Sequence, residues 1–459
     1  MLESYEIIVI ALLATFILLL FFGFPIAWTL AGISMLFAFG SIYATEFFNI
    51  DTYFLDSWSD VSIIVDRTWN LMENWTLTAL PMFVFMGLML ERSGMAESLM
   101  HNFTQVFGRF RGGLALAVVF IGILFAASTG IVGASVVLLT VLAMPLMLEQ
   151  GYSKRLSSGV IASSGTLGIL IPPSIMLVIM GDQLSLSVGD LFLGAVIPGL
   201  LLGLLYAAYI ILLAIFSPSS APAPKHLEPL SFRLVLSTIL SIVPPLGLIL
   251  AVLGTIFLGI ATPTEAAGIG AAGATLLAAI NRNLTWRVIK DVSYETTLTT
   301  AFIFGIFLGA TAFALVMRSL GGDSFIAHLL ESLPFGPEGL VLFVLLLAFL
   351  FGFFLDWLEI TLIFLPLMAP VILGLTFENV PSDYVGVWFT IMFAVALQTS
   401  FLTPPVGFSL FYLKGAAPPE VNTFDIYKGI IPFVILQVMG LFLCFMFPQI
   451  VLWLPQQAY

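Results

Sequence analysis

Apolar segments about 20 residues long recur along almost the whole chain, from Tyr5 to Leu454, and each can cross a lipid bilayer. Only 9% of the residues are charged, whereas a soluble domain has about 25%. In hydrocarbon, backbone N–H and C=O groups must find partners within the protein, so segments of this length fold as helices. The sequence therefore predicts an all-α, polytopic membrane protein. The opening apolar run lacks the basic flank of a cleavable signal peptide and is expected to be the first span.

Composition and motifs also exclude several functions. The net charge of −12, without a basic stripe, argues against binding to nucleic acid. The single cysteine, Cys444, excludes a disulfide framework and a cysteine-based metal site. The chain has no P-loop, no nucleophile elbow and no histidine in an apolar span that could act as a base. We therefore expect no enzyme, although an intramembrane enzyme or a structural scaffold is the alternative from a different class.

Two of the apolar segments are interrupted by polar residues followed by a double proline. The first interruption covers residues 163–173 and the second covers residues 398–405. Proline lacks an N–H and clashes with the carbonyl four residues earlier. The sequence thus predicts unpaired carbonyl oxygens at Gly168, Ile169, Ser400 and Phe401. Matched broken helices in the two halves of a membrane protein indicate the substrate and ion site of a transporter.

Two further apolar blocks, 113–148 and 338–377, each return to the side of the membrane from which they start. The flanks of the first block are basic and those of the second are acidic, which places them inside and outside, respectively. Polar residues at the middle of each block favour re-entrant hairpins that are buried against protein. Each half then has an odd number of traversals, so the second half is predicted to be inverted relative to the first.

The chain is thus predicted to consist of two repeats, with both termini on the periplasmic side. The predicted parts are a first inverted repeat over 1–216 (hairpin 113–148, broken helix 156–182), a cytoplasmic Pro-rich linker over 217–233, a second inverted repeat over 234–459 (hairpin 338–377, broken helix 383–413), and an external, acidic, Trp-containing insert over 46–75. The insert has no counterpart in the second half. It is expected to be a loop that lies at the lipid headgroups or forms a docking surface.

Shorter patterns add local predictions. Amphipathic stretches at 95–110 and 324–333 precede the two hairpins and are expected to be interfacial arms. Thr262 and Glu265 flank Pro263 in the pattern of a helix capping box, which gives this motif a structural explanation.

The polar residues at the interruptions supply hydroxyl and backbone oxygens, which suit hard cations. We expect one cation site between the tip at 128–129 and residues 165–172, and another between the Asp356 tip and residues 399–404. Asp356 is an ionisable residue at membrane depth, although it could instead reach water at the mouth of its hairpin. Sodium is favoured over protons because buried carboxylates are few and no histidine relay is visible. Simple proline kinks remain the alternative.

The expected cation ligands are Ser128, Gly165, Thr166, Gly168, Pro172, Asp356, Thr399, Ser400, Thr403 and Pro404. The expected substrate-binding residues are Ser128, Thr129, Gly130, Ser164, Asp356 and Thr399. N–H groups near the two hairpin tips are expected to be unpaired and to bind an anion.

Four runs, at residues 165–174, 261–267, 352–356 and 402–407, resemble the large membrane (M) subunit of tripartite ATP-independent periplasmic (TRAP) transporters. The resemblance covers the chain apart from the insert at 46–75. It implies a transporter of the bacterial inner membrane that imports an organic acid by an elevator motion and is driven by sodium, with two or more transported Na+ ions.

The resemblance also implies two partners, a small four-helix membrane (Q) subunit and a periplasmic substrate-binding (P) protein. No segment matches a fused small subunit, so the Q subunit is expected to be a separate polypeptide. A stand-alone sodium–carboxylate symporter of similar architecture is the alternative.

Overall fold

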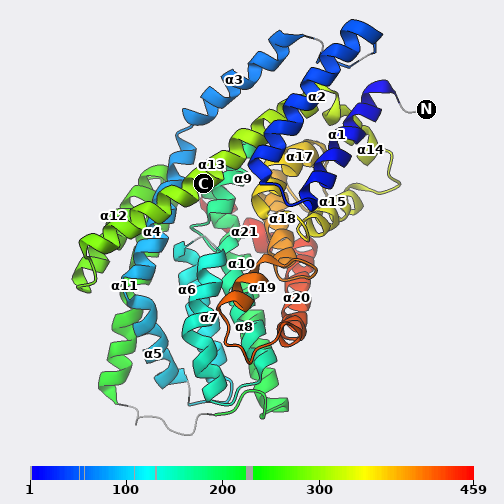
Figure 1. Cartoon of the computed structure of the whole chain (residues 1–459). Coiled ribbons are helices and arrows are strands. Elements are labelled where there is room, and N and C mark those ends of the chain that lie inside the picture. Colours follow the sequence, from blue (N-terminus) through cyan, green and yellow to red (C-terminus); the bar gives the residue numbers. More distant parts are fainter. Residues whose placement is uncertain are drawn as a thin grey trace. The chain divides into compact units, whose positions relative to one another are not determined.

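The computed structural model describes residues 3–50, 52–55, 57–107, 109–129, 132–223 and 231–458, and their regular structure is helical (Figure 1). Eight of the described helices are long and apolar enough to cross a membrane. The predicted all-α polytopic class is confirmed. The chain forms two compact units: unit 1 comprises residues 1–75, 298–344 and 355–378, and unit 2 comprises residues 76–297, 345–354 and 379–459.

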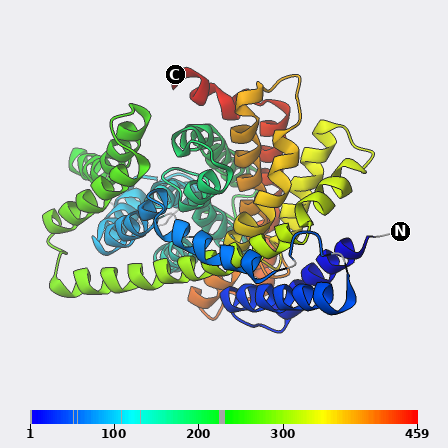
Figure 2. The same cartoon turned by 90° about the horizontal axis from the view of Figure 1, so that it is seen from above.

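Unit 1 contains the first helices of the chain together with most of α13 and the return segment of the second hairpin. Its elements are α1 (Ser4–Phe21), α2 (Ile26–Phe48), α3 (Trp58–Met72), most of α13 (Trp286–Ser319), α14 (Gly322–Glu331), the first half of α15 (Pro337–Phe351), α16 (Trp357–Glu359), the π-helix η3 (Ile360–Phe364) and α17 (Leu365–Leu373). Helices α1 and α2 lie side by side (Figures 1 and 2). A Cβ atom on Gly309 of α13 would lie 2.5 Å from the carbonyl oxygen of Ala27, so glycine permits close packing of α13 on α2.

The insert at 46–75 is not only a loop, because α3 occupies most of its second half. Ser57 caps this helix in a reciprocal capping box with Asp60, a local signal that the acidic composition obscured. Trp58 contacts Phe39 of α2 with ring centroids 4.7 Å apart. Burial is the main cause that lowers the pKa of Arg67, with a further contribution from Arg318. Trp69 is 65% exposed, and whether it meets lipid headgroups or a partner stays a prediction.

Unit 2 holds the first hairpin, both interrupted helices and the last helices of the chain. Its elements are η1 (Thr76–Thr78), α4 (Ala79–Arg92), α5 (Met95–Phe107), α6 (Gly113–Thr129), α7 (Val132–Glu149), α8 (Lys154–Thr166), η2 (Leu167–Ile169), α9 (Ile175–Leu184), α10 (Val188–Phe216), α11 (Phe232–Phe257), α12 (Pro263–Ile280), the start of α13, the end of α15, η4 (Ser382–Tyr384), α18 (Val385–Phe401), α19 (Phe408–Ala416), α20 (Thr423–Met446) and α21 (Gln449–Ala458). Helix α4 packs extensively against α12, and α8 packs extensively against α20.

The two halves of the chain have the same order of elements. Helix α4, arm α5, hairpin α6–α7, interrupted helix α8–α9 and helix α10 correspond in order to α13, α14, α15–α17, α18–α19 and α20. Both arms are helices, and Leu99 and Phe103 are buried on the inner face of α5, as the amphipathic pattern predicts. Helix α20 ends at Met446, and Pro448 separates it from α21.

The capping box at the start of α12 is confirmed. The backbone N–H of Thr262 donates to Glu265 Oε2 at 2.8 Å, and the N–H of Glu265 donates to Thr262 Oγ1 at 3.3 Å. Pro263 occupies the first turn, where its missing N–H costs nothing.

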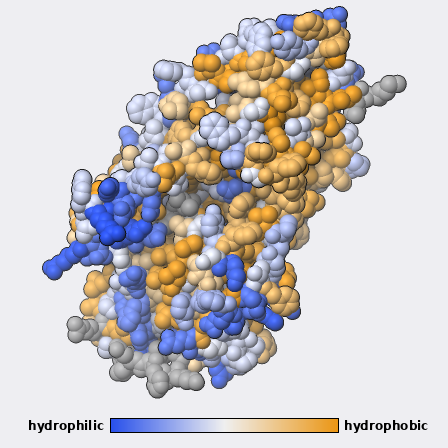
Figure 3. Space-filling model, in the orientation of Figure 1, coloured by the Kyte–Doolittle hydropathy of each residue, from blue (hydrophilic) through white to orange (hydrophobic). Residues whose placement is uncertain are grey.

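Large apolar side chains are exposed over wide areas of several helices. Examples are Leu240 on α11, which is 60% exposed, and Leu204 on α10, which is 68% exposed. Figure 3 shows extensive apolar surface on the face it presents, with hydrophilic residues gathered in separate clusters. This distribution is expected for helices whose outer faces contact lipid.

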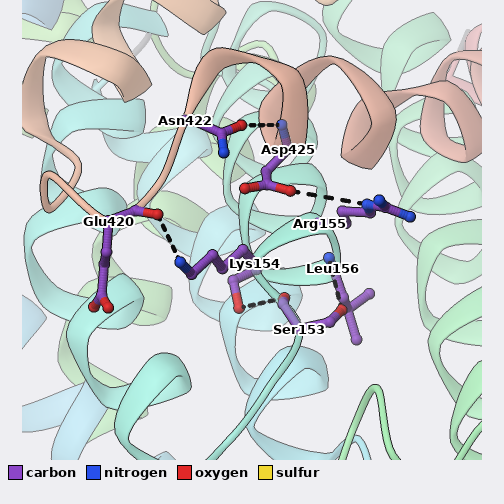
Figure 4. A network of polar contacts seen from close by, with 8 residues as sticks. Ser153, Lys154, Arg155, Leu156, Glu420, Asn422 and Asp425 are labelled. Carbon is purple, nitrogen blue, oxygen red and sulfur yellow. Dashed lines mark hydrogen bonds and ion pairs between the residues drawn. The ribbon is translucent and has the colours of Figure 1, made fainter.

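The first turn of α8 is tied to the segment between α19 and α20 by polar contacts (Figure 4). Lys154 Nζ donates to the carbonyl oxygen of Glu420 at 2.7 Å, and Arg155 Nε lies 3.9 Å from Asp425 Oδ1. Asn422 caps α20 by accepting from the N–H of Asp425. Because the Arg155 side chain is largely exposed, its ion pair contributes at most about 1 kcal/mol. The hydrogen bond from Lys154 instead holds the loop before α20 through the backbone carbonyl of Glu420.

Candidate ion and substrate site

The first double proline interrupts its helix as predicted. Helix α8 ends at Thr166, continues as one turn of 3₁₀-helix in η2, and resumes as α9 only at Ile175. The peptide bond between Pro172 and Pro173 is cis. All residues of this interruption are buried, so its backbone groups need partners within the protein.

The second double proline interrupts its helix in the same way. Helix α18 ends at Phe401, and α19 starts at Phe408 after Gly407, whose φ of 55° is in the left-handed region. The peptide bond between Pro404 and Pro405 is also cis. The two interruptions lie in the same unit, where α18 contacts both η2 and α9.

The prediction of four unpaired carbonyls at these interruptions is wrong for three of them. Ser174 Oγ donates to the carbonyl oxygen of Ile169, and Ser409 Oγ donates to that of Phe401 at 2.6 Å. The carbonyl oxygen of Ser400 accepts from the N–H of Thr403 at 3.0 Å. The unpaired carbonyl of Gly168 stays a prediction, which rests on Pro172, four residues later, having no N–H to donate. A serine thus stabilises one freed carbonyl in each half.

The role of Ser174 and Ser409 as donors to these carbonyls can be tested by removing their hydroxyls. Ser174→Ala and Ser409→Ala should each lower the free energy of unfolding by about 1–3 kcal/mol, because each leaves a buried carbonyl without a donor. Ser158→Ala is the matched control, since this buried hydroxyl in α8 has no hydrogen-bond partner among the described residues. Thermal unfolding of the purified chain in detergent measures the difference. Equal midpoints for the three variants would refute the capping role.

The hydroxyls around the interruptions retain oxygen lone pairs that can face a cation. Thr166 donates to the carbonyl of Ser163 at 2.9 Å, and Ser400 donates to that of Leu397 at 2.7 Å. Thr399 and Thr403 also donate to carbonyls one turn earlier in α18. A hydroxyl has one donor and two acceptor sites, so each oxygen can still coordinate a positive ion after donating. The oxygen-only chemistry suits a hard cation.

The first hairpin and the first interrupted helix meet at the predicted residues. A Cβ atom on Gly122 of α6 would lie 2.6 Å from Ser164 Cβ, and one on Gly165 would lie 2.5 Å from Val136 Cγ2 of α7. Both helices of the hairpin therefore pack closely against α8 at positions 164 and 165. Ser164 is fully buried, and its Oγ has no hydrogen-bond partner among the described residues.

The second hairpin makes the corresponding contact with the second interrupted helix. Gly352, just after α15, lies so close to Ser400 that any side chain at position 352 would overlap the Ser400 hydroxyl. Each hairpin thus uses a glycine to bring its first helix against a serine near the double proline.

Gln398 is a candidate residue to which the sequence prediction gave no role. Its side chain is fully buried, and neither Oε1 nor Nε2 has a hydrogen-bond partner among the described residues. Leaving a buried amide unpaired costs about 1–3 kcal/mol. Its place immediately before Thr399 was visible in the sequence, but its burial and lack of partners required the structure. We therefore add Gln398 to the candidate ligands.

Asp356 lies at the start of α16 and does not leave the adjacent N–H unpaired. Its Oδ1 accepts from the N–H of Trp357 at 2.9 Å, which corrects the expectation of a free N–H for anion binding at this position. Glu359 is 1% exposed, and its Oε2 has no hydrogen-bond partner among the described residues. Both carboxylates belong to unit 1, whereas Thr399 and Thr403 belong to unit 2, so a shared cation site remains a prediction.

The tip of the first hairpin is the least defined part of the predicted site. Gly130 lies outside the described residues, as do the side chains of Ser128 and Thr129 at the end of α6. Their roles as ligands remain predictions. Pro172 and Pro404 lie at the interruptions themselves, where they have no N–H to donate to the preceding turns.

Comparison with known proteins identifies the family. Residues 13–450 match the family described as "Tripartite ATP-independent periplasmic transporter, DctM component". The chain belongs to this family. The C4-dicarboxylate TRAP transporter large permease of Pseudomonas aeruginosa is 31% identical over 78% of this chain and 82% of that protein. The ectoine TRAP transporter large permease of Halomonas elongata is 30% identical over 84% of this chain and 87% of that protein.

A solved structure supports the fold. The Alcanivorax borkumensis YdaH transporter aligns with a TM-score of 0.56 at 13% identity and covers 80% of this chain and 84% of that chain. Family membership makes the chain a multi-pass permease and one component of a tripartite transporter of the inner membrane, rather than an enzyme.

Proposed function

We propose that this TRAP permease couples the import of an organic acid to the movement of two or more sodium ions. The observation that carries the proposal is the pair of interrupted helices in unit 2, which places Ser164, Gln398 and the neighbouring hydroxyls in buried positions. Broken helices of this kind form substrate and ion sites in secondary transporters. Neutral oxygen ligands favour an alkali or other hard cation over a soft metal.

Sodium binding would also reduce the cost of moving an anion through the membrane. Placing a carboxylate at the centre of the bilayer costs free energy unless a positive charge is paired with it. The relatives named above carry a C4-dicarboxylate and ectoine, and both substrates contain a carboxylate. We therefore assign carboxylates as the substrate class and place the anion next to the cation-binding oxygens.

The proposed transport cycle is an elevator motion of the hairpins and interrupted helices. The tight contacts of Gly122 with Ser164 and of Gly352 with Ser400 support movement of these segments together. The arms α5 and α14 precede the hairpins and are suited to link moving and fixed parts. A small four-helix Q subunit and a periplasmic substrate-binding P protein would complete the complex and deliver the substrate.

The coupling ion is tested by uptake into proteoliposomes that contain the permease, its small subunit and its binding protein. Replacing external sodium with choline at constant pH should abolish concentrative uptake. Thr403→Ala and Asp356→Ala should each raise the sodium concentration for half-maximal uptake by about tenfold, the loss expected for one charge-assisted ligand. Undiminished uptake in choline would refute sodium coupling. Normal sodium dependence in both variants would remove these two residues from the ion site.

A stand-alone sodium–carboxylate symporter is the second candidate. Uptake by the purified chain without the small subunit and the binding protein would favour it. Uptake that requires both added proteins supports the tripartite assignment.

A further inference from the structure

A separate cavity of about 370 Å³ lies in unit 2 where the α4–α5 junction, the middle of α11 and the α12–α13 loop meet. It is formed by residues away from both interrupted helices. Its polar lining consists of Ser93, Ser98, Ser237, Ser241, Asn281 and Asn283. None of these side chains is charged, so the hydrogen-bonding balance of the wall determines which ligand it suits.

The four serines of the cavity present mainly acceptors. Each donates its hydroxyl hydrogen to a backbone carbonyl one turn earlier on its own segment. The bonds run from Ser93 to Leu90, from Ser98 to Gly94 at 3.3 Å, from Ser237 to Leu234 at 2.9 Å and from Ser241 to Ser237 at 2.8 Å. Since a hydroxyl has only one hydrogen, the oxygens that face the cavity can accept but not donate. Ser93 Oγ already accepts from the N–H of Met95 at 3.3 Å and Ser241 Oγ from Asn102 Nδ2 at 2.6 Å, which leaves each of these two oxygens one further acceptor site.

The two asparagines strengthen this bias. Asn283 Nδ2 donates to the carbonyl oxygen of Ser93 at 2.7 Å, and Asn281 Nδ2 donates to the same oxygen at 3.4 Å. Each amide thus uses one of its two N–H donors on the protein and retains its carbonyl oxygen as an acceptor. Gly94 makes room for this arrangement, because any side chain there would overlap the Asn283 amide.

We propose that this cavity binds the primary ammonium group of a phosphatidylethanolamine headgroup. A primary ammonium has three N–H donors and no acceptor, which complements an acceptor-rich, neutral wall. A quaternary choline headgroup has no N–H, and an anionic headgroup would add acceptors to acceptors. The volume exceeds that of a bare ion and is within the range of small-molecule sites.

Arg282 provides a partner for the phosphate of the same lipid. It lies between Asn281 and Asn283 in the sequence and is exposed, and it makes no ion pair with any residue that the structure describes. The hydrophilic cluster at the left of Figure 3 overlies the region where α12 meets α13 in Figure 1. Arginine binds phosphate oxygens through a planar set of N–H donors.

Native mass spectrometry of the full chain, delipidated and then offered equal amounts of phosphatidylethanolamine and phosphatidylcholine, tests the proposal. The unmodified chain should retain phosphatidylethanolamine with at least about tenfold preference, the effect of one charge-assisted hydrogen bond. The double variant Ser237→Ala/Ser241→Ala should lose most of this preference. Ser332→Ala is the matched control, because this exposed hydroxyl also donates to its own helix but lies outside the cavity. Arg282→Gln should reduce retention of both lipids and leave their ratio unchanged.

Equal retention of the two lipids, or an unchanged preference in the double serine variant, would overturn the proposal. Soluble glycerophosphoethanolamine distinguishes a lipid from a free amine. It should displace the lipid only at a large excess, because it lacks the acyl chains that partition into the bilayer. Displacement at equal concentration would assign the cavity to a soluble primary amine and refute the lipid assignment.

Discussion

Gly159→Ala and Gly429→Ala should each cause a severe loss of stability, larger than the about 1–3 kcal/mol typical of an overpacked core. The two glycines form the crossing of α8 and α20. A Cβ atom on Gly159 would overlap the carbonyl oxygen of Gly429, and one on Gly429 would overlap that of Arg155. Backbone atoms of a packed helix cannot rotate away as a side chain can. The two helices would have to separate, and α8 carries the first interruption.

Thermal unfolding and the yield of monodisperse protein in detergent measure this effect. Gly268→Ala in α12 and Gly254→Ala in α11 are matched controls, because a Cβ atom at either position would meet open space. These controls should be neutral or stabilised by up to about 1 kcal/mol, the difference in helix propensity between glycine and alanine. If Gly159→Ala unfolded at the same temperature as the controls, the close crossing of α8 and α20 would be wrong.

The helices and interruptions were predictable because they depend on local chemistry. Each proline removes one hydrogen bond from a helix, but it does not by itself end the helix, since α11 continues through Pro244 and Pro245. Helices α8 and α18 end where a double proline follows several small or polar residues. The capping box of Thr262 and Glu265 is equally local. The same signal at Ser57 and Asp60 was present in the insert, but the acidic composition around it suggested a loop.

What could not be predicted depends on contacts between distant segments. Ser409 lies eight residues after Phe401, beyond the irregular segment 402–407, so the donor to the Phe401 carbonyl could not be deduced from spacing. The roles of Gly122 and Gly352 depend on which helix lies opposite. Gln398 is a candidate ligand because it is buried and both polar atoms of its side chain have no partner among the described residues, and burial is a property of the packed structure.

Gln398→Leu should make the protein more stable and abolish most of its transport. Leucine fills a similar volume and removes a buried amide whose Oε1 and Nε2 are both unpaired among the described residues, so stability should rise by up to about 1–3 kcal/mol. If Gln398 binds the transported ion or anion, uptake should fall at least about tenfold, because a charge-assisted hydrogen bond or ion ligand is lost. A gain in stability with a loss of function is typical of a residue kept for binding.

Gln437→Leu is the matched control for this experiment. Gln437 is also a fully buried glutamine of unit 2, and its Oε1 has no partner among the described residues, but its Nε2 donates to Tyr206 Oη at 2.8 Å. Its replacement leaves the buried phenol without that partner and should reduce stability by about 1–3 kcal/mol, while uptake per folded protein stays unchanged. Opposite signs of the two stability changes, combined with loss of uptake only in Gln398→Leu, would separate a ligand from a packing residue. If Gln398→Leu destabilised the protein and transported normally, its amide would be bonded within the fold, and the site would have to be built from the neighbouring hydroxyls alone.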